Sequence, residues 1–274
     1  SKDKTCKFWD IKSGKELHTL IEHEEPVNTV AIYPNGEKAI SGSDDKNCII
    51  WDLVNGNKMK ILKGHTNSIN SLSICSNGKI GISGSADFTC IVWDLETGHK
   101  IKIFREHNIL VTSVSICPDG KRAISGSMDY SCILWEIESS KNITTKSSNL
   151  SVDFIKIFPN GKKAISGSWD NNCIVWDLES RKKVRTLYGH TKSISSVSIC
   201  PNGKLAISGS LDNTCKLWDL NNSVLLKTLR GHRNSVFSVA ICPDGRTAIS
   251  GSVDKTCIVW DLQNGSVLQI LKGH

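Results

Sequence analysis

The hydrophobic and polar positions of this chain follow a pattern that recurs about seven times. In the last full copy, "NSVFSVAIC" (234–242) alternates apolar and polar residues, and "TAISGS" follows the turn "PDGR". The segment "TCIVWDL" (256–262) is almost continuously apolar, whereas "SVLQILKG" (266–273) mixes apolar with polar residues. Alternation indicates a strand with one buried face, and a continuous apolar run indicates a strand covered on both faces. Each copy therefore predicts four short β-strands separated by turns.

The tryptophan that ends each apolar run gives the period of the pattern. Successive spacings are 42, 42, 42, 41, 42 and 42 residues, and Trp169 alone stands outside the series. The series consists of Trp9, Trp51, Trp93, Trp135, Trp176, Trp218 and Trp260. Helical repeats of similar length need longer stretches of 3.6-residue periodicity, which Gly, Pro and Asn-Gly interrupt here. Four-stranded antiparallel sheets with two apolar faces bury both faces by stacking radially, so we expect an all-β fold, a β-propeller of four-stranded antiparallel blades.

The two ends of the chain do not complete this count. A seven-bladed ring with one shortened unit needs about 19 residues more than the 274 present. Trp9 belongs to a unit without its first two strands, and His274 opens a unit without strands. We expect one propeller domain over residues 1–274, with six full blades and one half blade; among the full blades, the one around 136–158 is degenerate. The ring closure is expected to be incomplete, as in a fragment of a longer chain, and prone to association, whereas a complete ring needs no obligate oligomer.

The paired residues "GH" near the start of each unit and "WD" about 28 residues later resemble the WD40 repeat over the whole chain. Glu22 and Glu106 replace the Gly, and Glu136 replaces the Asp, in single units. The resemblance implies a hydrogen-bonded tetrad of His, Ser, Asp and Trp within each blade. Five units keep 22 residues from His to Asp and six from Asp to Trp. The expected tetrads are His23, Ser41, Asp45, Trp51; His65, Ser83, Asp87, Trp93; His107, Ser125, Asp129, Trp135; His190, Ser208, Asp212, Trp218; and His232, Ser250, Asp254, Trp260.

Hydrolases build catalytic triads from the same Ser, His and Asp. A catalytic triad occurs once, in a cleft with an oxyanion site. A buried carboxylate also needs hydrogen bonds for purely structural reasons, and an imidazole between it and a hydroxyl supplies them. Because five copies follow the structural period, we expect no catalytic residue among them. The unit that ends at Trp176 carries Ser148 or Asn149 in place of His beside Ser166, Asp170 and Trp176, which indicates a decayed blade or, alternatively, a mobile contact or modification loop.

Composition narrows the remaining possibilities. The chain is 39% hydrophobic and 22% charged, with a net charge of +7 spread over many loops and no apolar run of membrane-spanning length. Its eleven cysteines follow the repeat without a CxxC pair, which favours buried free thiols in a reducing compartment over disulfides or zinc. We therefore expect no metal or cofactor, no membrane association, and a cytoplasmic location, with the nucleus as the alternative. No P-loop or HExxH motif is present.

The WD40 resemblance also implies where a partner binds. In such propellers, one face often binds through the residue before the tetrad Asp and through residues three and five positions after the His. The expected partner-binding residues are Met128, Trp169, Leu211, Val253, Phe237 and Leu110. A regular scaffold does not require Trp169, so we expect a peptide or protein domain to dock over it. The alternative is that these side chains pack on neighbouring loops, whereas Lys2, Asp44, Asn28 and Asn70 give other units a polar face.

The function expected from these features is a non-enzymatic scaffold for protein–protein interaction. Near-identical repeats resemble propeller arrays attached to signalling NTPases and kinases, which implies a sensor or docking region of a larger signalling protein. One alternative is a propeller hydrolase or lyase, which needs an unrepeated polar cluster around the channel. Another is an RNA- or phosphoinositide-binding propeller, less favoured because the charge is diffuse. The basic segment 179–190, with Arg181, Lys182, Lys183 and Arg185, is either a solvated outer strand or a contact for acidic protein or RNA.

Overall fold

The computed structural model describes residues 1–10, 15–139, 142–146 and 151–272, and gives the backbone alone for 142–146. Every regular secondary-structure element among these residues is a β-strand. The chain divides into two compact units, Ser1–Thr144 and Thr145–His274. No helix in the described residues is long and apolar enough to span a membrane.

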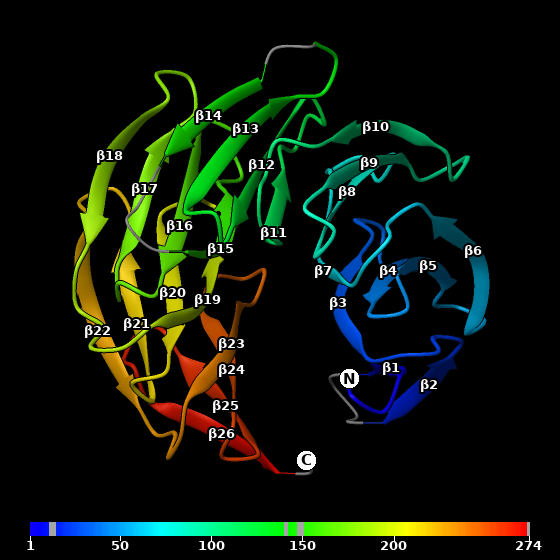
Figure 1. Cartoon of the computed structure of the whole chain (residues 1–274). Coiled ribbons are helices and arrows are strands. Elements are labelled where there is room, and N and C mark those ends of the chain that lie inside the picture. The colour runs from blue at the N-terminus through cyan, green and yellow to red at the C-terminus, as the bar shows by residue number, and fades with distance from the viewer. Residues whose placement is uncertain (11–14, 140–141, 147–150, 273–274) are drawn as a thin grey trace. The chain divides into compact units, whose positions relative to one another are not determined.

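The first unit contains one two-stranded and three four-stranded antiparallel sheets, the last of which ends in β14 at the unit boundary (Figure 1). Its strands are β1 (Thr5–Trp9), β2 (Glu16–Ile21), β3 (Val27–Ile32), β4 (Lys38–Ser43), β5 (Asn47–Asp52), β6 (Asn57–Lys63), β7 (Ile69–Ile74), β8 (Ile80–Ser85), β9 (Cys90–Asp94), β10 (Lys100–Phe104), β11 (Val111–Ile116), β12 (Arg122–Ser127), β13 (Ser131–Glu136) and β14 (Asn142–Lys146).

The second unit contains three four-stranded antiparallel sheets, each formed by four consecutive strands. Its strands are β15 (Val152–Ile157), β16 (Lys163–Ser168), β17 (Cys173–Asp177), β18 (Lys182–Leu187), β19 (Ile194–Ile199), β20 (Leu205–Ser210), β21 (Thr214–Asp219), β22 (Val224–Arg230), β23 (Val236–Ile241), β24 (Thr247–Ser252), β25 (Thr256–Asp261) and β26 (Val267–Lys272).

Turn chemistry connects the strands of each sheet. The turn between the first and second strands of a sheet places a glycine in the left-handed backbone conformation, as at Gly203 with φ of 69°. The second turn places the residue after the tetrad Asp there, as at Asn213 with φ of 68° and Lys255 with φ of 67°. Asn tolerates this conformation better than Lys, because its short polar side chain bonds the local backbone. The same tight turns therefore recur from sheet to sheet.

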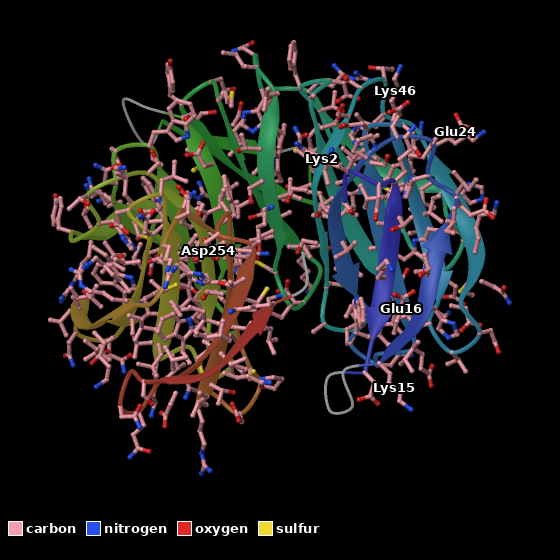
Figure 2. All side chains as sticks on the ribbon, turned by 90° about the horizontal axis from the view of Figure 1, so that it is seen from below. Lys2, Lys15, Glu16, Glu24, Lys46 and Asp254 are labelled. Atoms are coloured by element: carbon pink, nitrogen blue, oxygen red, sulfur yellow. The ribbon has the colours of Figure 1, made fainter. Side chains whose placement is uncertain are left out.

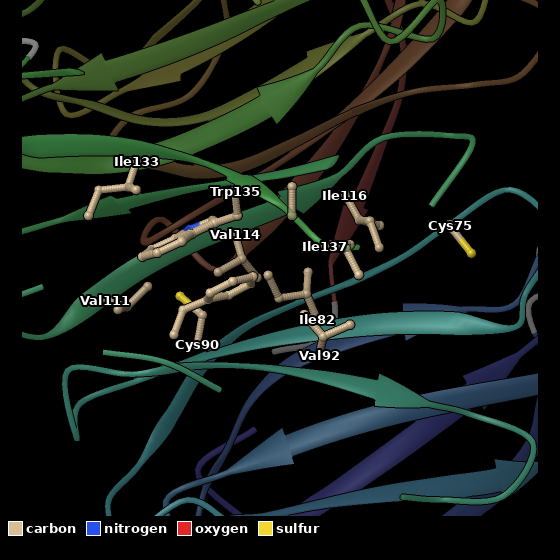
Figure 3. Packing of buried hydrophobic residues seen from close by; sticks show 12 residues of the cluster. Cys75, Ile82, Cys90, Val92, Val111, Val114, Ile116, Ile133, Trp135 and Ile137 are labelled. Carbon is tan, nitrogen blue, oxygen red and sulfur yellow. The ribbon is translucent and has the colours of Figure 1, made fainter. Parts of the chain in front are cut away.

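Consecutive sheets of each unit pack face to face. Between β7–β10 and β11–β14, Ile82 and Val92 of one sheet contact a buried cluster that includes Val114 and Trp135 of the other (Figure 3). In the second unit, Val197 and Trp218 belong to the cluster between β15–β18 and β19–β22. A third cluster, between β19–β22 and β23–β26, includes Val236 and Trp260. Because both faces of the inner sheets are covered, their second and third strands carry almost no exposed side chain.

The predicted fold class is confirmed: the protein is an all-β propeller of six four-stranded antiparallel sheets with one two-stranded sheet among the described residues. The last predicted strands, 234–242 and 256–262, correspond to β23 and β25 with shorter ends. The predicted half blade corresponds to β1–β2. The expectation of one domain over 1–274 and of an open ring closure stays a prediction.

Candidate functional site

The sequence-predicted tetrad residues converge at one end of each sheet. We call this the tetrad end: it holds the loop between the second and third strands and the loop that follows the fourth strand. In the first unit, Lys2, Glu24 and Lys46 lie at the tetrad end, whereas Lys15 and Glu16 lie at the opposite end (Figure 2). The His belongs to the loop before the first strand, the Ser and Trp to the second and third strands, and the Asp to the loop between them.

All five predicted tetrads are joined by hydrogen bonds. His Nδ1 lies 2.6–2.9 Å from the Asp Oδ2, and His Nε2 lies 2.7 Å from the Ser Oγ in each. The Trp Nε1 lies 2.7–2.8 Å from the same Ser Oγ. The backbone N–H of the residue after the His also donates to the Asp, as Thr191 does to Asp212 at 3.0 Å. Each tetrad therefore links two loops to two strands.

The direction of these bonds follows from the groups involved. The Trp N–H donates to the Ser oxygen, so the Ser O–H is free to donate to Nε2 while Nδ1–H donates to the carboxylate. Desolvation raises the pKa of Asp212, but hydrogen bonds from His190, Thr214 and the Thr191 backbone outweigh it and hold the pKa below its usual range. Burial lowers the pKa of His107, against the opposing effect of Asp129. The arrangement favours a neutral imidazole beside an ionised carboxylate.

The burial of these tetrads distinguishes them from a catalytic triad. The serines of the five tetrads are at most 1% exposed, and their histidines are at most 8% exposed. Each Ser oxygen already contacts both an indole N–H and an imidazole nitrogen, as Ser208 does with Trp218 and His190. A nucleophile must reach a substrate carbonyl beside an oxyanion site. These hydroxyls are enclosed, so the geometry suits a structural link between loops and strands.

The sheet β15–β18, which belongs to the repeat that ends at Trp176, retains part of this arrangement. Trp176 Nε1 donates to Ser166 Oγ at 2.8 Å, as in the other sheets. Asp170 accepts the backbone N–H of Asn172 at 3.0 Å. Ser148 and Asn149, the candidates for the missing His position, lie outside the described residues. The Trp–Ser hydrogen bond between β17 and β16 is therefore present, whereas no imidazole partner is identified among the described residues.

Sequence reasoning missed Asp153, which lies in β15 beside this incomplete tetrad. Its Oδ2 is buried without a hydrogen-bond partner among the described residues. Burial raises the pKa of Asp153 to about 6, and the nearby Asp170 adds to the shift. Comparison of the repeats would have found it. The counterparts Asn28 and Asn70 donate their side-chain N–H to Ile69 and Val111 carbonyls of the next sheet, which an ionised carboxylate cannot do.

We expect Asp153→Asn to stabilise the protein at pH 7.5 by about 1 kcal/mol, a value reduced for solvent screening because the side chain is only half-buried. The folded-state pKa is raised, so the stabilising contribution of the protonated acid is present below about pH 4 and is lost as the pH rises through about 6. Urea denaturation at pH 4.5, 6 and 7.5 measures this. An equal pH dependence in wild type and variant between 4.5 and 7.5 would contradict the assignment.

The six predicted partner-binding residues all lie at the tetrad end, with different exposure. Trp169, Phe237 and Val253 are 60%, 57% and 46% exposed. Leu211 is half-buried at the matching position of β19–β22. In the first unit, Met128 and Leu110 are also half-buried, and the Met128 N–H donates to the Leu110 carbonyl at 3.2 Å. Of the six predicted residues, the exposed ones thus lie in the second unit, on β15–β18 and β23–β26. Phe88, Ile109 and Tyr130 are exposed apolar side chains at the tetrad end of the first unit.

Neither metal nor thiol chemistry gains support from the described residues. They contain no group of three His, Cys, Asp or Glu residues arranged to hold a metal ion. All eleven cysteines are free, and eight of them are buried. Burial raises the pKa of Cys90 and of Cys215 to about 12, so both thiols stay protonated and unreactive near neutral pH. The burial of these eight agrees with the prediction that the cysteines pack as small hydrophobic side chains, whereas Cys6, Cys242 and Cys257 are half-buried.

Comparison with known families agrees with the geometry. The profile described as "WD domain, G-beta repeat" matches residues 14–52, 56–94, 98–136, 140–177, 181–219 and 223–261. The chain belongs to the WD40 repeat family. WD40 repeats typically mediate protein–protein interactions, and the family is generally non-enzymatic. No curated protein matches the chain.

The basic segment of this WD40 chain lies on an outer strand. Lys182, Lys183 and Arg185 belong to β18 and are exposed. Arg185 Nη1 donates to the Asn222 carbonyl at 2.9 Å, which ties it to the next sheet. The segment therefore has a structural contact of its own. The outer-strand interpretation accounts for Arg185 without a nucleic acid.

Proposed function

We propose that this WD40 chain is a non-enzymatic scaffold that binds a peptide or protein partner at the tetrad end of its second unit. The buried tetrads hold the loops in place, and the side chains that flank them remain free to contact a partner. We further propose that the chain is a docking region of a larger signalling protein in the cytoplasm or nucleus. The free thiols support a reducing compartment.

The observation that carries this proposal is the exposure of Trp169. It precedes Asp170, in a loop whose counterparts carry Asp44, Ala86 and Leu211. Its side chain is 60% exposed, although a packed aromatic side chain buries about 150–250 Å². Exposed aromatic side chains in a fixed loop are the residues that most often dominate protein interfaces. The scaffold covers less than half of this Trp, so partner contact is the role it fits best.

Replacement of the indole tests the proposal. We expect Trp169→Ala to weaken binding of a dodecapeptide, selected from a random display library on the wild-type chain, by about thirtyfold. The urea midpoint should remain within error of wild type because the side chain is largely exposed. Isothermal titration calorimetry gives the affinity, and far-UV circular dichroism gives the midpoint.

Trp9→Ala is the matched control, because Trp9 is also exposed, at 48%, but lies in β1 of the first unit. It should bind the selected peptide like wild type. Unchanged peptide affinity in Trp169→Ala together with a lowered urea midpoint would show that the indole packs on its own loops, and would remove the binding role.

A further inference from the structure

The tetrad end of β23–β26 contains a hollow of about 440 Å³. Arg233, Asp254, Lys255, Thr256, Ile270 and Lys272 are among the residues that line it. The three cationic side chains are all exposed. We call this cavity the anion hollow.

Three separate elements bring the cations together. Arg233 follows His232 in the loop between β22 and β23, so its position is fixed by the tetrad. Lys255 follows Asp254 in the left-handed turn between β24 and β25. Lys272 is paired with Thr256 in the ladder of β25 and β26. The fold therefore places three positive charges around one short turn.

The carboxylate in the hollow does not neutralise these cations by direct pairing. Asp254 accepts hydrogen bonds from His232 Nδ1 at 2.9 Å, Thr256 Oγ1 at 2.6 Å and the Arg233 backbone N–H at 2.8 Å. In the part of the chain that the structure describes, no ion pair or side-chain hydrogen bond joins Arg233, Lys255 or Lys272 to a neighbour. Their donors are available to a ligand.

The repeats show that this charge is not required by the scaffold. The same three positions in the preceding sheet carry Thr191, Asn213 and Arg230. The sheet β3–β6 carries Glu24, Lys46 and Lys63, and the sheet β7–β10 carries Thr66, Phe88 and Arg105. Among the sheets in which all three positions are described, three cations together occur in β23–β26. The repeat structure alone therefore does not require three cations at these positions.

An apolar pair lies at the same end of this sheet as the anion hollow, although neither residue lines the hollow. Val253 immediately precedes Asp254, and Phe237 is the second residue of β23. Their counterparts in the sheet β3–β6 are Asn28 and Asp44. The side-chain N–H of Asn28 donates to Asp44 Oδ1 at 2.6 Å, so side chains at these two positions reach one another. Phe237 and Val253 thus form an exposed apolar surface at the same end of the sheet as the three unpaired cations.

We propose that the anion hollow binds an oxyanion group of the partner peptide, with an apolar side chain of the same peptide resting on Phe237 and Val253. The group is the carboxylate of Asp or Glu, or a phosphate, both of which match guanidinium and ammonium donors. The inference rests on the proposed function, because the peptide must dock at the tetrad end. It adds the chemistry of the partner, a peptide that carries both an anionic and an apolar residue.

The test replaces the three cations by residues that remove charge with little structural cost. Arg233→Thr and Lys255→Asn introduce the residues of the preceding sheet, and Lys272→Gln keeps a long polar side chain. We expect the triple variant to bind the selected dodecapeptide about tenfold more weakly at 0.1 M salt. Lys204→Gln with Arg246→Gln, two exposed cations at the opposite end, is the control and should bind like wild type.

Changes in the peptide identify the anionic group. Substitution of Gln for the essential Glu, or Asn for Asp, should weaken binding to wild type but not to the triple variant. A phosphoserine in place of that acid should bind at least as tightly if phosphate is the natural group, and more weakly if carboxylate is. Inorganic phosphate should compete with the acidic peptide for wild type in either case.

The outcomes separate this inference from the proposed function. A Trp169→Ala variant that loses binding, beside a triple variant that keeps it with an unchanged urea midpoint, overturns the anion hollow and leaves the partner surface. Full binding in both variants overturns both proposals. Binding of polyuridylate, but of no peptide, with dependence on the same three cations would assign the hollow to nucleic acid and contradict the peptide proposal.

Discussion

We expect Asp212→Ala to lower the free energy of unfolding by about 3–5 kcal/mol. The carboxylate is 7% exposed and accepts hydrogen bonds from His190 Nδ1 at 2.7 Å and Thr214 Oγ1 at 2.6 Å. It also accepts the backbone N–H groups of Thr191 and Thr214. Its removal leaves buried donors unsatisfied on two loops at once, and each buried unsatisfied group costs about 1–3 kcal/mol. Urea denaturation followed by circular dichroism measures the loss.

The repeat that forms the sheet β15–β18 provides a control for this expectation. Asp170 occupies the same repeat position, but no His stands 22 residues before it. Asp170→Ala should therefore cost about 1–2 kcal/mol less than Asp212→Ala, because no buried imidazole donor loses its acceptor. Equal losses in the two variants would show that the His–Asp link contributes little, and would contradict the tetrad account.

Gly209→Ala is expected to destabilise the protein by about 2 kcal/mol through overpacking. A Cβ added at Gly209, in the "SGS" of β20, would lie 2.8 Å from Val236 Cγ1 and 2.9 Å from Val239 Cγ1 of the next sheet. Both valines are buried in the cluster between the sheets, so neither moves without loss of packing. The urea midpoint should fall, and the distance between β19–β22 and β23–β26 should increase in a crystal structure of the variant.

Gly251→Ala is the matched control, at the same repeat position in β24. There the added Cβ meets only Cys257 Sγ, at 3.7 Å, which is ordinary van der Waals contact. We expect a change within about 0.5 kcal/mol, since the loss of backbone freedom in the unfolded chain offsets the small packing change. A large loss in Gly251→Ala would indicate that backbone conformation rather than sheet packing requires these glycines.

The repeat made most of the fold predictable. A tetrad residue is recognisable because its neighbours in the tetrad stand at constant intervals, as His190, Asp212 and Trp218 do. The period also located the strands, because the alternating run and the continuous apolar run differ in how many of their faces are buried. Strand ends were less certain, since turn residues and strand residues overlap in type.

The candidate binding site was predictable only in part. The resemblance placed Trp169 and Leu211 at matching positions, but only the structure shows that Trp169 is exposed and Leu211 half-buried. The carboxyl group of Asp153 and the three cations of the anion hollow were missed. Their significance depends on which donors and acceptors are already satisfied, and a sequence pattern does not show that.

Hydrogen–deuterium exchange of the indole N–H groups, followed by NMR with and without the selected peptide, tests the division between buried tetrads and an exposed binding side chain most directly. The indole N–H groups of the five tetrad tryptophans should exchange slowly in the free protein, and that of Trp169 should exchange quickly and become protected when the peptide binds. Rapid exchange of Trp93 and Trp218 in the free protein, or no protection of Trp169 by bound peptide, would contradict the account.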